Sequence, residues 1–460
     1  MIEIGLNSLL VGLSNPSVLD KNDFHFKWAS LLVSQPDTSI NAFKDNYMEG
    51  CNNTDKRFSF FSANPTHQRS FNNQDELMSW KDSLPTIEAS TSDIPFHSGW
   101  IGYFAYPTAN KHKVAEFNYY PWTICLDHHT NGFHLLGKPD TSAKEAFEWL
   151  LQAQADLSSS KVSKNASIDE ASLHATKFKA SPFKAVWSKT EYQQAFNKVQ
   201  SYLLAGDCYQ VNLTQPYISQ RYSGSPSNTL LPLFKALKPS FGCYFQGQDC
   251  ELVSVSPERF ISIDSCGKLE AKPIKGTIKR SEDPMLDSGL ITQLLSSEKD
   301  LAENLMIVDL LRNDLGKSAL PGSVQVEKLF GLESQPNVHH LVSTITAQLK
   351  PNISPADAIY NAFPGGSITG APKIRAMEII DELEAQPRSL YCGSFGYFSD
   401  TGHADFNILI RSLEFRDNTI TCWGGGGITI DSKCDDEYEE SITKIRRIMD
   451  VVESVGKVSD

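Results

Sequence analysis

The chain has 460 residues, of which 40% are apolar and 21% are charged, and its formal net charge at pH 7 is -13. This composition is typical of a globular protein, and the negative charge argues against binding to nucleic acid or to an anionic membrane surface, because phosphate groups would be repelled. An anionic substrate stays open, since the local charge of a site decides what it binds.

Targeting and redox signals are weak. Nine cysteines are scattered along the chain without a Cys-x-x-Cys pair, which disfavours a zinc ribbon or a disulfide framework and indicates a reducing compartment. The first ten residues have no basic segment before their short apolar run, and no stretch approaches the roughly 18 apolar residues of a membrane span. We therefore expect a cytoplasmic protein with no membrane span.

Three regions follow one another along the chain. Residues 1–156 are rich in aromatic and turn-forming residues, and short runs at 57–62, 99–106 and 132–136 predict strands of a β-rich N-terminal region. Residues 157–186 are largely rich in Ser, Lys and Ala, which is typical of a solvated linker. Residues 187–455 carry the clearest patterns and form the expected catalytic region.

The elements expected in this last region alternate between helix and strand. A capping box begins at Ser188, apolar residues follow at helical spacing, and Gly206 fits the end of that helix. Strands are expected over 211–218 and 252–263, and helices over 287–315 and 442–455. The fold class is therefore mixed α/β or α+β, and the absence of a phosphate-binding glycine motif leaves nucleotide binding without support.

Two pairs of carboxylates have helical spacing. Asp300 and Glu303 stand three residues apart, as do Glu437 and Glu440, so each pair would share one helix face. Two such faces brought together would repel each other unless a cation lay between them, and an all-oxygen ligand set suits magnesium rather than zinc. From spacing alone, two solvated acidic helix faces are the commoner interpretation.

Two glycine-rich segments offer backbone amides. The runs 423–428 and 363–373 have little Cβ obstruction, and successive N–H groups in such loops can hold an anion. In the second run a helix is expected to begin near Pro372, which would add positive potential. Tight turns are the alternative, although four consecutive glycines carry a high cost in chain entropy.

Three basic side chains remain ambiguous. Lys275 lies in the segment 272–280, and a lone lysine is most often at the surface. Arg411 follows the apolar residues 408–410, where a charge needs a carboxylate partner from the protein or from a ligand. His340 fits either an acid catalyst or a core histidine.

Together these segments resemble a known family. They are similar to the chorismate-using enzymes, which include anthranilate synthase component I, aminodeoxychorismate synthase component I, and the isochorismate and salicylate synthases. The similarity covers roughly residues 187–450, and it is carried by Ser256-Pro-Glu-Arg-Phe260, Pro273-Ile-Lys-Gly-Thr277, Pro364-Gly-Gly-Ser-Ile-Thr-Gly-Ala-Pro-Lys373 and the segments 206–214, 303–314, 338–342, 410–411 and 424–427. The resemblance implies one large unit of two opposed β-sheets flanked by helices, with the active site between them.

The resemblance also implies roles for the acidic residues. In the family, magnesium bridges the ring carboxylate of chorismate and acidic side chains. Matched by motif position, the direct ligands would be Glu303 and Glu440, and Asp300 and Glu437 would support them through water.

Substrate binding is implied in the same way. Arg411 and Tyr391 would hold the enolpyruvyl carboxylate of chorismate with the backbone at Gly426 and Gly427, and Thr369 lies in the loop that closes on the substrate. Further candidates are Thr277 and Gln210 for substrate binding and His340 near the reacting ring.

Two positions separate members of the family. Isochorismate and salicylate synthases carry a water-activating lysine where this chain has Gln210, and anthranilate synthases read Pro-Ile-Ala-Gly-Thr where this chain has Lys275. Lysine at the second position is the mark of the aminodeoxychorismate synthases, so the resemblance implies amination of carbon 4 of chorismate on the path to 4-aminobenzoate. Lys275 would be the nucleophile and Glu258 the general acid; anthranilate synthase component I is the alternative.

The source of ammonia is a further expectation. No Gly-x-Cys-x-Gly nucleophile motif of a glutaminase occurs in the chain. The resemblance implies that ammonia comes from solution or from a separate glutamine amidotransferase subunit.

Overall fold

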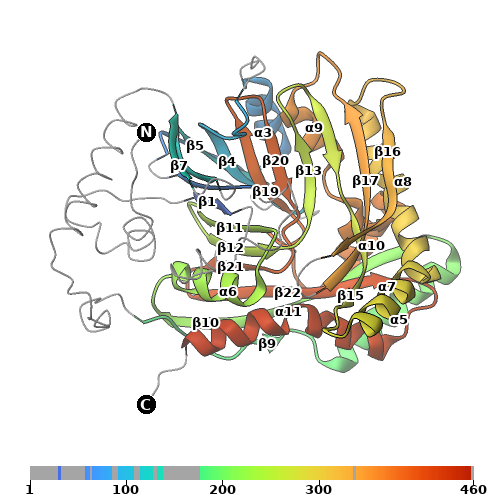
Figure 1. Ribbon diagram of the computed structural model, residues 1–460. Coiled ribbons are helices and arrows are strands. Elements are labelled where there is room, and N and C mark those ends of the chain that lie inside the picture. The colour runs from blue at the N-terminus through green and yellow to red at the C-terminus, as the bar shows by residue number, and fades with distance from the viewer. Residues whose placement is uncertain are drawn as a thin grey trace.

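The computed structural model describes the following parts of the chain: 29–32, 57–62, 65–84, 92–107, 114–127, 132–137, 177–334 and 338–456. Within them, two large antiparallel sheets of twelve and ten strands dominate the molecule, and helices flank both (Figure 1). This agrees with the predicted mixed fold of two sheets and helices.

The twelve-stranded sheet joins early and late segments of the chain. Its order is β18 (Gly370–Ala371), β10 (Gln210–Ser223), β22 (Thr419–Ile428), β21 (Ser412–Arg416), β12 (Glu251–Ser256), β11 (Phe241–Gln246), β1 (Ala29–Leu32), β2 (Phe58–Ser62), β6 (Trp122–Asp127) and β7 (Gly132–Gly137). Two short strands, β8 (Lys179–Ala180) and β9 (Lys184–Ala185), pair with β10.

The ten-stranded sheet is built in the same way. Its order is β15 (Ile274–Lys279), β17 (Val338–Gln348), β14 (Lys268–Ala271), β13 (Arg259–Ile263), β20 (Ala404–Asn407), β19 (Ser394–Ser399), β4 (Gly99–Phe104), β5 (Ala115–Tyr120) and β3 (His67–Phe71), with β16 (Gln325–Ser334) on β17. Strands of the N-terminal region therefore enter both sheets. Of the expected linker at 157–186, residues up to 176 lie outside the described part, and 177–186 carry β8 and β9.

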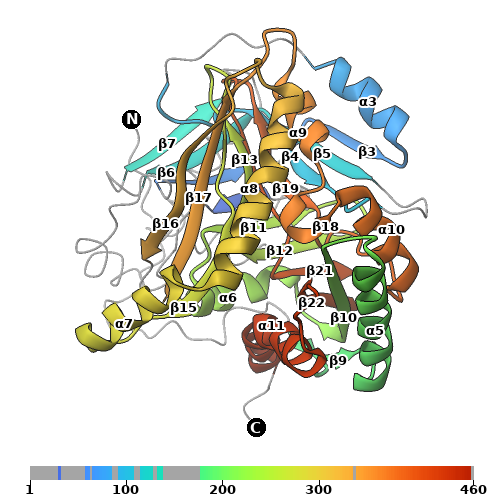
Figure 2. The same cartoon turned by 90° about the vertical axis from the view of Figure 1, so that its right-hand side faces the viewer.

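Helices cover the outer faces of the sheets (Figure 2). They are α3 (Gln74–Asp82), α5 (Lys189–Ala205), α6 (Leu230–Leu237), α7 (Pro284–Leu295), α8 (Glu298–Ser318), α9 (Pro355–Ala362), α10 (Lys373–Leu383) and α11 (Cys434–Gly456), with short 3-10 turns η4 (Pro226–Thr229) and η5 (Gly366–Ile368). The predicted capping box starts α5: the Glu191 amide donates to Ser188 Oγ and the Ser188 amide donates to Glu191 Oε2. In the described part of the chain, every helix falls short of the length and apolarity needed to span a membrane.

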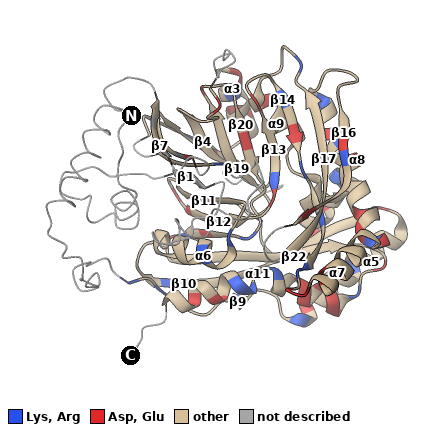
Figure 3. Ribbon diagram, in the orientation of Figure 1, with Lys and Arg blue, Asp and Glu red and all other residues tan. Residues whose placement is uncertain are grey.

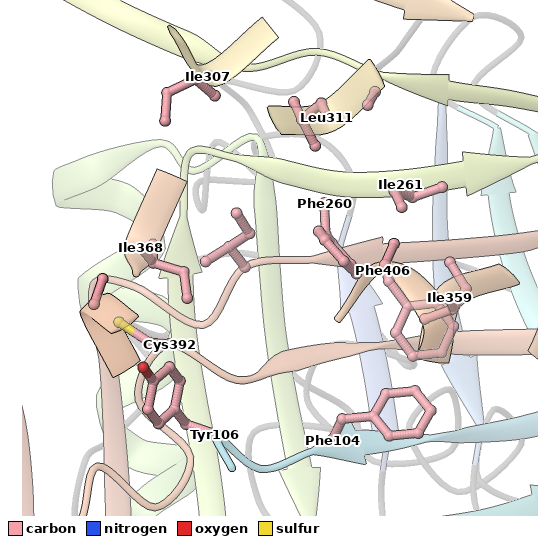
Figure 4. Close-up of a cluster of buried hydrophobic side chains, with 14 of the residues drawn as sticks. Phe104, Tyr106, Phe260, Ile261, Ile307, Leu311, Ile359, Ile368, Cys392 and Phe406 are labelled. Carbon is pink, nitrogen blue, oxygen red and sulfur yellow. The ribbon is translucent and has the colours of Figure 1, made fainter. Parts of the chain in front are cut away.

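The core lies between the sheets and under α8 and α9. Phe60 of β2 packs against Tyr397 of β19 with ring centroids 6.1 Å apart, and Phe245 of β11 lies 5.5 Å from Phe395 of β19, so aromatic contacts join the two sheets. Figure 4 shows a second cluster, in which strands of the ten-stranded sheet meet α8 and α9 through Phe104, Phe260, Phe406, Ile307, Leu311 and Ile359. This packing fixes the strands from which the functional side chains project.

Candidate active site

Two of the predicted residues lie where the chain crosses from one sheet to the other. Glu258 lies between β12 and β13, and Arg411, whose φ of 52° is left-handed, lies between β20 and β21. The crossings are hydrogen-bonded together, because the Ile408 amide donates to the Glu258 carbonyl at 3.1 Å and the Val255 amide donates to the Arg411 carbonyl at 3.0 Å. The single strand expected over 252–263 is therefore wrong: it breaks at Pro257, which has no N–H for a sheet hydrogen bond.

Glu258 is a buried carboxyl group faced by cations. Its side chain is 8% exposed, and burial raises its pKa. Lys275, the Ser367 side chain, Arg411 and Lys444 each act to lower that pKa, without overcoming burial. Because the three charges come from β15, from the β20–β21 crossing and from α11, the tertiary fold assembles this environment.

Lys275 lies on an irregular edge strand. The register of β15 against β17 shifts between Ile274 and Thr277, and Gly276 at the shift has a φ of 86°. A Cβ on Gly276 would lie 3.1 Å from Asp300 Cβ, so the shift places this segment against α8. Bulges of this kind redirect side chains at functional sites. Lys275 is half-buried, and its charge acts on both Glu258 and Glu440, so it is not a fully exposed lysine.

The two predicted carboxylate pairs lie on two different helices. Asp300 and Glu303 belong to α8, and Glu437 and Glu440 belong to α11, as their spacing predicted. The charge of Lys299 on α8 acts to lower the pKa of both Glu437 and Glu440, although burial keeps that of Glu437 above its usual value. Both acidic and basic residues lie along α11 in Figure 3.

Lysines accompany these carboxylates. Lys444 Nζ lies 2.8 Å from Glu440 Oε1, and Lys299 Nζ lies 3.9 Å from Glu303 Oε1. Burial acts to raise the pKa of Glu440, but the nearby charge of Lys444 brings that pKa below its usual value. For Glu437, burial raises the pKa even though the Ser432 hydroxyl donates a hydrogen bond to its Oε1 at 2.6 Å. In the described ranges no three His, Cys, Asp or Glu side chains converge closely enough to hold a metal ion. The nearby donors are all carboxylate oxygens, a set that fits magnesium chemically.

The four-glycine run is a strand and not an open loop, so that expectation was wrong. Gly424–Gly427 lie within β22 and pair with Leu213 and its neighbours in β10. A Cβ on Gly424 would lie 2.5 Å from the Ser441 carbonyl of α11, and one on Gly427 would meet the Gln210 side-chain amide. Glycine is needed here because a helix and a buried side chain approach the backbone on both faces.

The other glycine-rich segment is a compact loop tied to its surroundings. It contains η5 and leads into α10, which begins at Lys373 as predicted. Thr369 is fully buried, and its hydroxyl donates to the Gly365 carbonyl at 3.1 Å. Lys373 Nζ donates to the Pro364 carbonyl at 2.8 Å and contacts Asp314 Oδ2 at 2.6 Å. The loop also carries Ser367, whose side chain acts to lower the pKa of Glu258.

The remaining candidates lie on both sheets. The Tyr391 ring stacks on Trp423 with centroids 5.5 Å apart and an interplanar angle of 6°. Gln210 is 1% exposed, and in the described part of the chain its Oε1 has no hydrogen-bond partner. Thr277 Oγ1 lies 2.8 Å from Nδ1 of the half-buried His340.

Three features were not predicted from the sequence. His339, not His340, is the buried histidine, and its Nε2 lies 3.1 Å from Asp287 Oδ1. Ser367 and Lys444 were also missed, although the spacing of four between Glu440 and Lys444 is a pattern that indicates an ion pair on a helix.

The sequence matches the chorismate binding enzymes over residues 30–450. The chain belongs to this family. Aminodeoxychorismate synthase component 1 of Escherichia coli K12 is 41% identical over 391 residues, which cover 82% of this chain and 81% of that protein. The enzyme of the same name from Klebsiella aerogenes is 41% identical over 374 residues, 78% of each chain.

Among solved structures, anthranilate synthase component I of Streptococcus pneumoniae has the same fold. It superposes with a TM-score of 0.74 at 26% identity, covering 91% of this chain and 99% of that one. Sequence identity therefore supports the aminodeoxychorismate synthases over the anthranilate synthase alternative. The family match also includes the N-terminal region from residue 30, beyond the range 187–450 that carries the recognised motifs.

Proposed function

We propose that this chain aminates chorismate at carbon 4 of its ring, giving 4-amino-4-deoxychorismate, the precursor of 4-aminobenzoate in folate biosynthesis. The identity to proteins named aminodeoxychorismate synthase component 1 supports this proposal. The observation that carries it is the half-buried Lys275, which is electrostatically coupled to the buried carboxyl group of Glu258.

Lys275 and Glu258 meet the two chemical requirements of this reaction. A lysine nucleophile must be neutral, and the leaving hydroxyl group must receive a proton. Burial raises the pKa of Glu258 and so favours its protonated form. A proton passed from Lys275 to Glu258 leaves a neutral amine and a protonated, uncharged carboxylic acid ready together.

The substitution then takes two steps, each with displacement of a leaving group. Lys275 Nζ bonds to carbon 2, the double bond shifts, and the carbon 4 hydroxyl leaves as water with the proton from Glu258. Ammonia next bonds to carbon 4, the double bond shifts back, and the bond from carbon 2 to Nζ breaks. Two such displacements give retention of configuration at carbon 4, and the balance is chorismate plus ammonia to product plus water.

We assign substrate binding to the crossing beside Glu258. Burial lowers the pKa of Arg411, and Glu258 is the one charged group in the described part of the chain that opposes this effect. A guanidinium in this position suits the enolpyruvyl carboxylate, since it forms two parallel hydrogen bonds to such a group. Tyr391, Thr369, Gly426 and Gly427 are proposed to complete the pocket.

We propose magnesium as the cofactor, with Glu303 and Glu440 as direct ligands and Asp300 and Glu437 behind them. The electrostatic effect of Lys299 on α8 upon Glu437 and Glu440 of α11 supports this set. When bound, the ion would neutralise the ring carboxylate and orient the substrate. Without the ion, Lys299 offsets the negative charge of Glu303, and Lys444 offsets that of Glu440.

Ammonia is proposed to come from a glutamine amidotransferase subunit in the cytosol. The relatives are named as component 1, which implies a second component. Alone, this chain should use ammonium at raised pH, where free ammonia is available. Hydrolysis of glutamine by the purified single chain would contradict the two-subunit arrangement.

Product identification tests the proposal. Purified protein with chorismate, magnesium and ammonium should yield 4-amino-4-deoxychorismate with its enolpyruvyl group retained, as measured by liquid chromatography and mass spectrometry. Anthranilate together with pyruvate would show instead that the chain is an anthranilate synthase.

A further inference from the structure

A single lysine closes the base of the glycine-rich loop 364–373. The side chain of Lys373, the first residue of α10, is only 16% exposed, and its ammonium group has three acceptors. Nζ donates to the Ala362 carbonyl at 3.1 Å, to the Pro364 carbonyl at 2.8 Å and to Asp314 Oδ2 at 2.6 Å. Because an ammonium group has three protons, these acceptors account for all of them. The proposed chemistry uses neither Lys373 nor Asp314.

Asp314 joins this lysine to a second one. It belongs to α8, its side chain is 3% exposed, and its Oδ1 accepts from Lys317 Nζ at 3.0 Å. Lys317 also donates to the Asn361 carbonyl of α9 at 3.3 Å, outside the loop. The two lysines therefore share one carboxylate on α8, but Lys317 reaches the end of α9 and Lys373 reaches into the loop. Figure 2 shows α8 and α9 side by side.

The start of the loop lies against both crossings between the sheets. A Cβ on Gly365 would lie 3.4 Å from Ile408 Cδ1 and 3.6 Å from Phe260 Cδ2. Phe260 follows Glu258 by two residues, and the Ile408 amide donates to the Glu258 carbonyl. The carbonyl of Pro364 that the lysine holds precedes this contact by one residue. The lysine therefore sets where the loop meets the crossings.

The middle of the loop is tied to its start. The Thr369 hydroxyl donates to the Gly365 carbonyl at 3.1 Å, so the position of Gly365 affects that of Thr369. From the other side, Asn212 of β10 donates from its side chain to the Ile368 carbonyl at 2.9 Å and from its amide to the Thr369 carbonyl at 2.8 Å. Thr369 is one of the residues proposed to complete the substrate pocket. A contact at the base of the loop is thus two hydrogen bonds from a proposed substrate-binding residue.

Helix capping is the structural alternative for these lysines. The last carbonyls of a helix have no partner within it, and a cation near them is favourable. Lys317 meets this need at Asn361, and Lys373 meets it at Ala362. Capping does not explain the bond to the Pro364 carbonyl, which lies beyond the end of α9. A buried ion pair also adds little net stability, because both charges lose their hydration.

We propose that Lys373, held by Asp314, is a positioning residue that keeps the loop 364–373 in the conformation that binds chorismate. The inference rests on the proposed function in one respect, that Thr369 lies in the chorismate pocket. The three protons of the ammonium group are taken by the protein, so the lysine acts on the substrate through the loop.

The consequence is a separation of binding from turnover. Without the lysine, the loop occupies its binding conformation for only part of the time, and the apparent dissociation constant of chorismate rises by the inverse of that fraction. A fraction of about one tenth raises KM about tenfold. At saturating chorismate the loop is held by the substrate itself, so kcat is retained.

The experiment compares Lys373→Met with the parent enzyme. Rates of chorismate consumption at saturating magnesium and ammonium should give a KM for chorismate raised about tenfold and a kcat within about twofold of the parent value. Hydrogen exchange, measured by mass spectrometry, should be faster in the peptide that covers 364–373. Magnesium binding without chorismate, measured by calorimetry, should be unchanged, because the proposed ligands lie outside the loop. Asp314→Asn should raise KM in the same direction, and it replaces Lys373→Met if that variant does not fold.

Lys317→Met is the matched control, since it removes the other lysine of the same carboxylate and a cap of α9, but no contact with the loop. It should lower Tm and leave KM in place. A parent-like KM in Lys373→Met, unchanged exchange of the loop peptide, or an equal rise of KM in Lys317→Met would overturn the inference. Because consumption of chorismate is measured, an anthranilate product would refute the proposed function while the comparison of KM values still decides the role of Lys373.

Discussion

At the scale of single residues, Lys275 decides which reaction is proposed. Its strand is distorted so that it lies beside Glu258 and Glu440, and neither neighbour is close in sequence. Lys275→Ala should lose most amination at carbon 4 and still bind chorismate and magnesium. Lys275→Arg should be inactive as well, because a guanidinium stays protonated and cannot attack carbon 2.

A covalent role for Lys275 has its own signature. With chorismate and magnesium but without ammonia, intact-protein mass spectrometry should show a ring-derived addition, located on the Lys275 peptide after digestion. Lys299→Ala serves as the control, since it also removes a lysine near the carboxylates and should keep the adduct. Parent-like formation of the 4-amino product by Lys275→Ala would refute the assignment.

The acidic residues give a second prediction at this scale. Glu303→Ala and Glu440→Ala should each lower the rate about a hundredfold or more, equivalent to several kcal/mol of transition-state stabilisation. EDTA should abolish turnover and magnesium should restore it. Full activity in either variant would remove that residue from the ligand set, and Glu439→Ala, one position from Glu440 on an exposed part of α11, should behave like the parent.

At the scale of elements, the contact of α11 with β22 depends on glycine. Gly424→Ala would place a Cβ 2.5 Å from the Ser441 carbonyl and 3.0 Å from Ile445 Cδ1. Relieving this overlap should cost about 1–3 kcal/mol of unfolding free energy and lower Tm in thermal denaturation. Gly316→Ala in α8 is the control, because nothing lies within 4 Å of its Cβ and alanine there should stabilise the helix by about 1 kcal/mol. Equal effects of the two variants would contradict this account.

At the scale of the whole molecule, the buried charge of Glu258 should reduce stability. Burial raises its folded pKa above the unfolded value, so the folded state binds more protons and stability falls as pH rises through that interval. Below the unfolded pKa the carboxyl group is protonated in both states and the effect vanishes. Glu258→Gln should therefore raise Tm at neutral pH, with a smaller gain near pH 4 and with activity lost. A gain that is independent of pH would show that another interaction is responsible.

The sequence alone determined the local features of this protein. The capping box fixed the start of α5, the spacing of carboxylates placed both pairs on helices, and the motifs around Lys275 and Glu258 indicated the family. Each depends on neighbours within a few residues, where hydrogen bonding and helical periodicity act directly.

Only the tertiary structure decided how these segments meet. It broke the expected strand at Pro257, made the glycine run a strand under α11, and buried His339 in place of His340. It also brought Lys275 from the neighbouring sheet region, and Arg411 and Lys444 from more than a hundred residues away in sequence, to Glu258. Steric room beside a backbone and the burial of a charge arise from elements distant in sequence, so no local pattern could supply them.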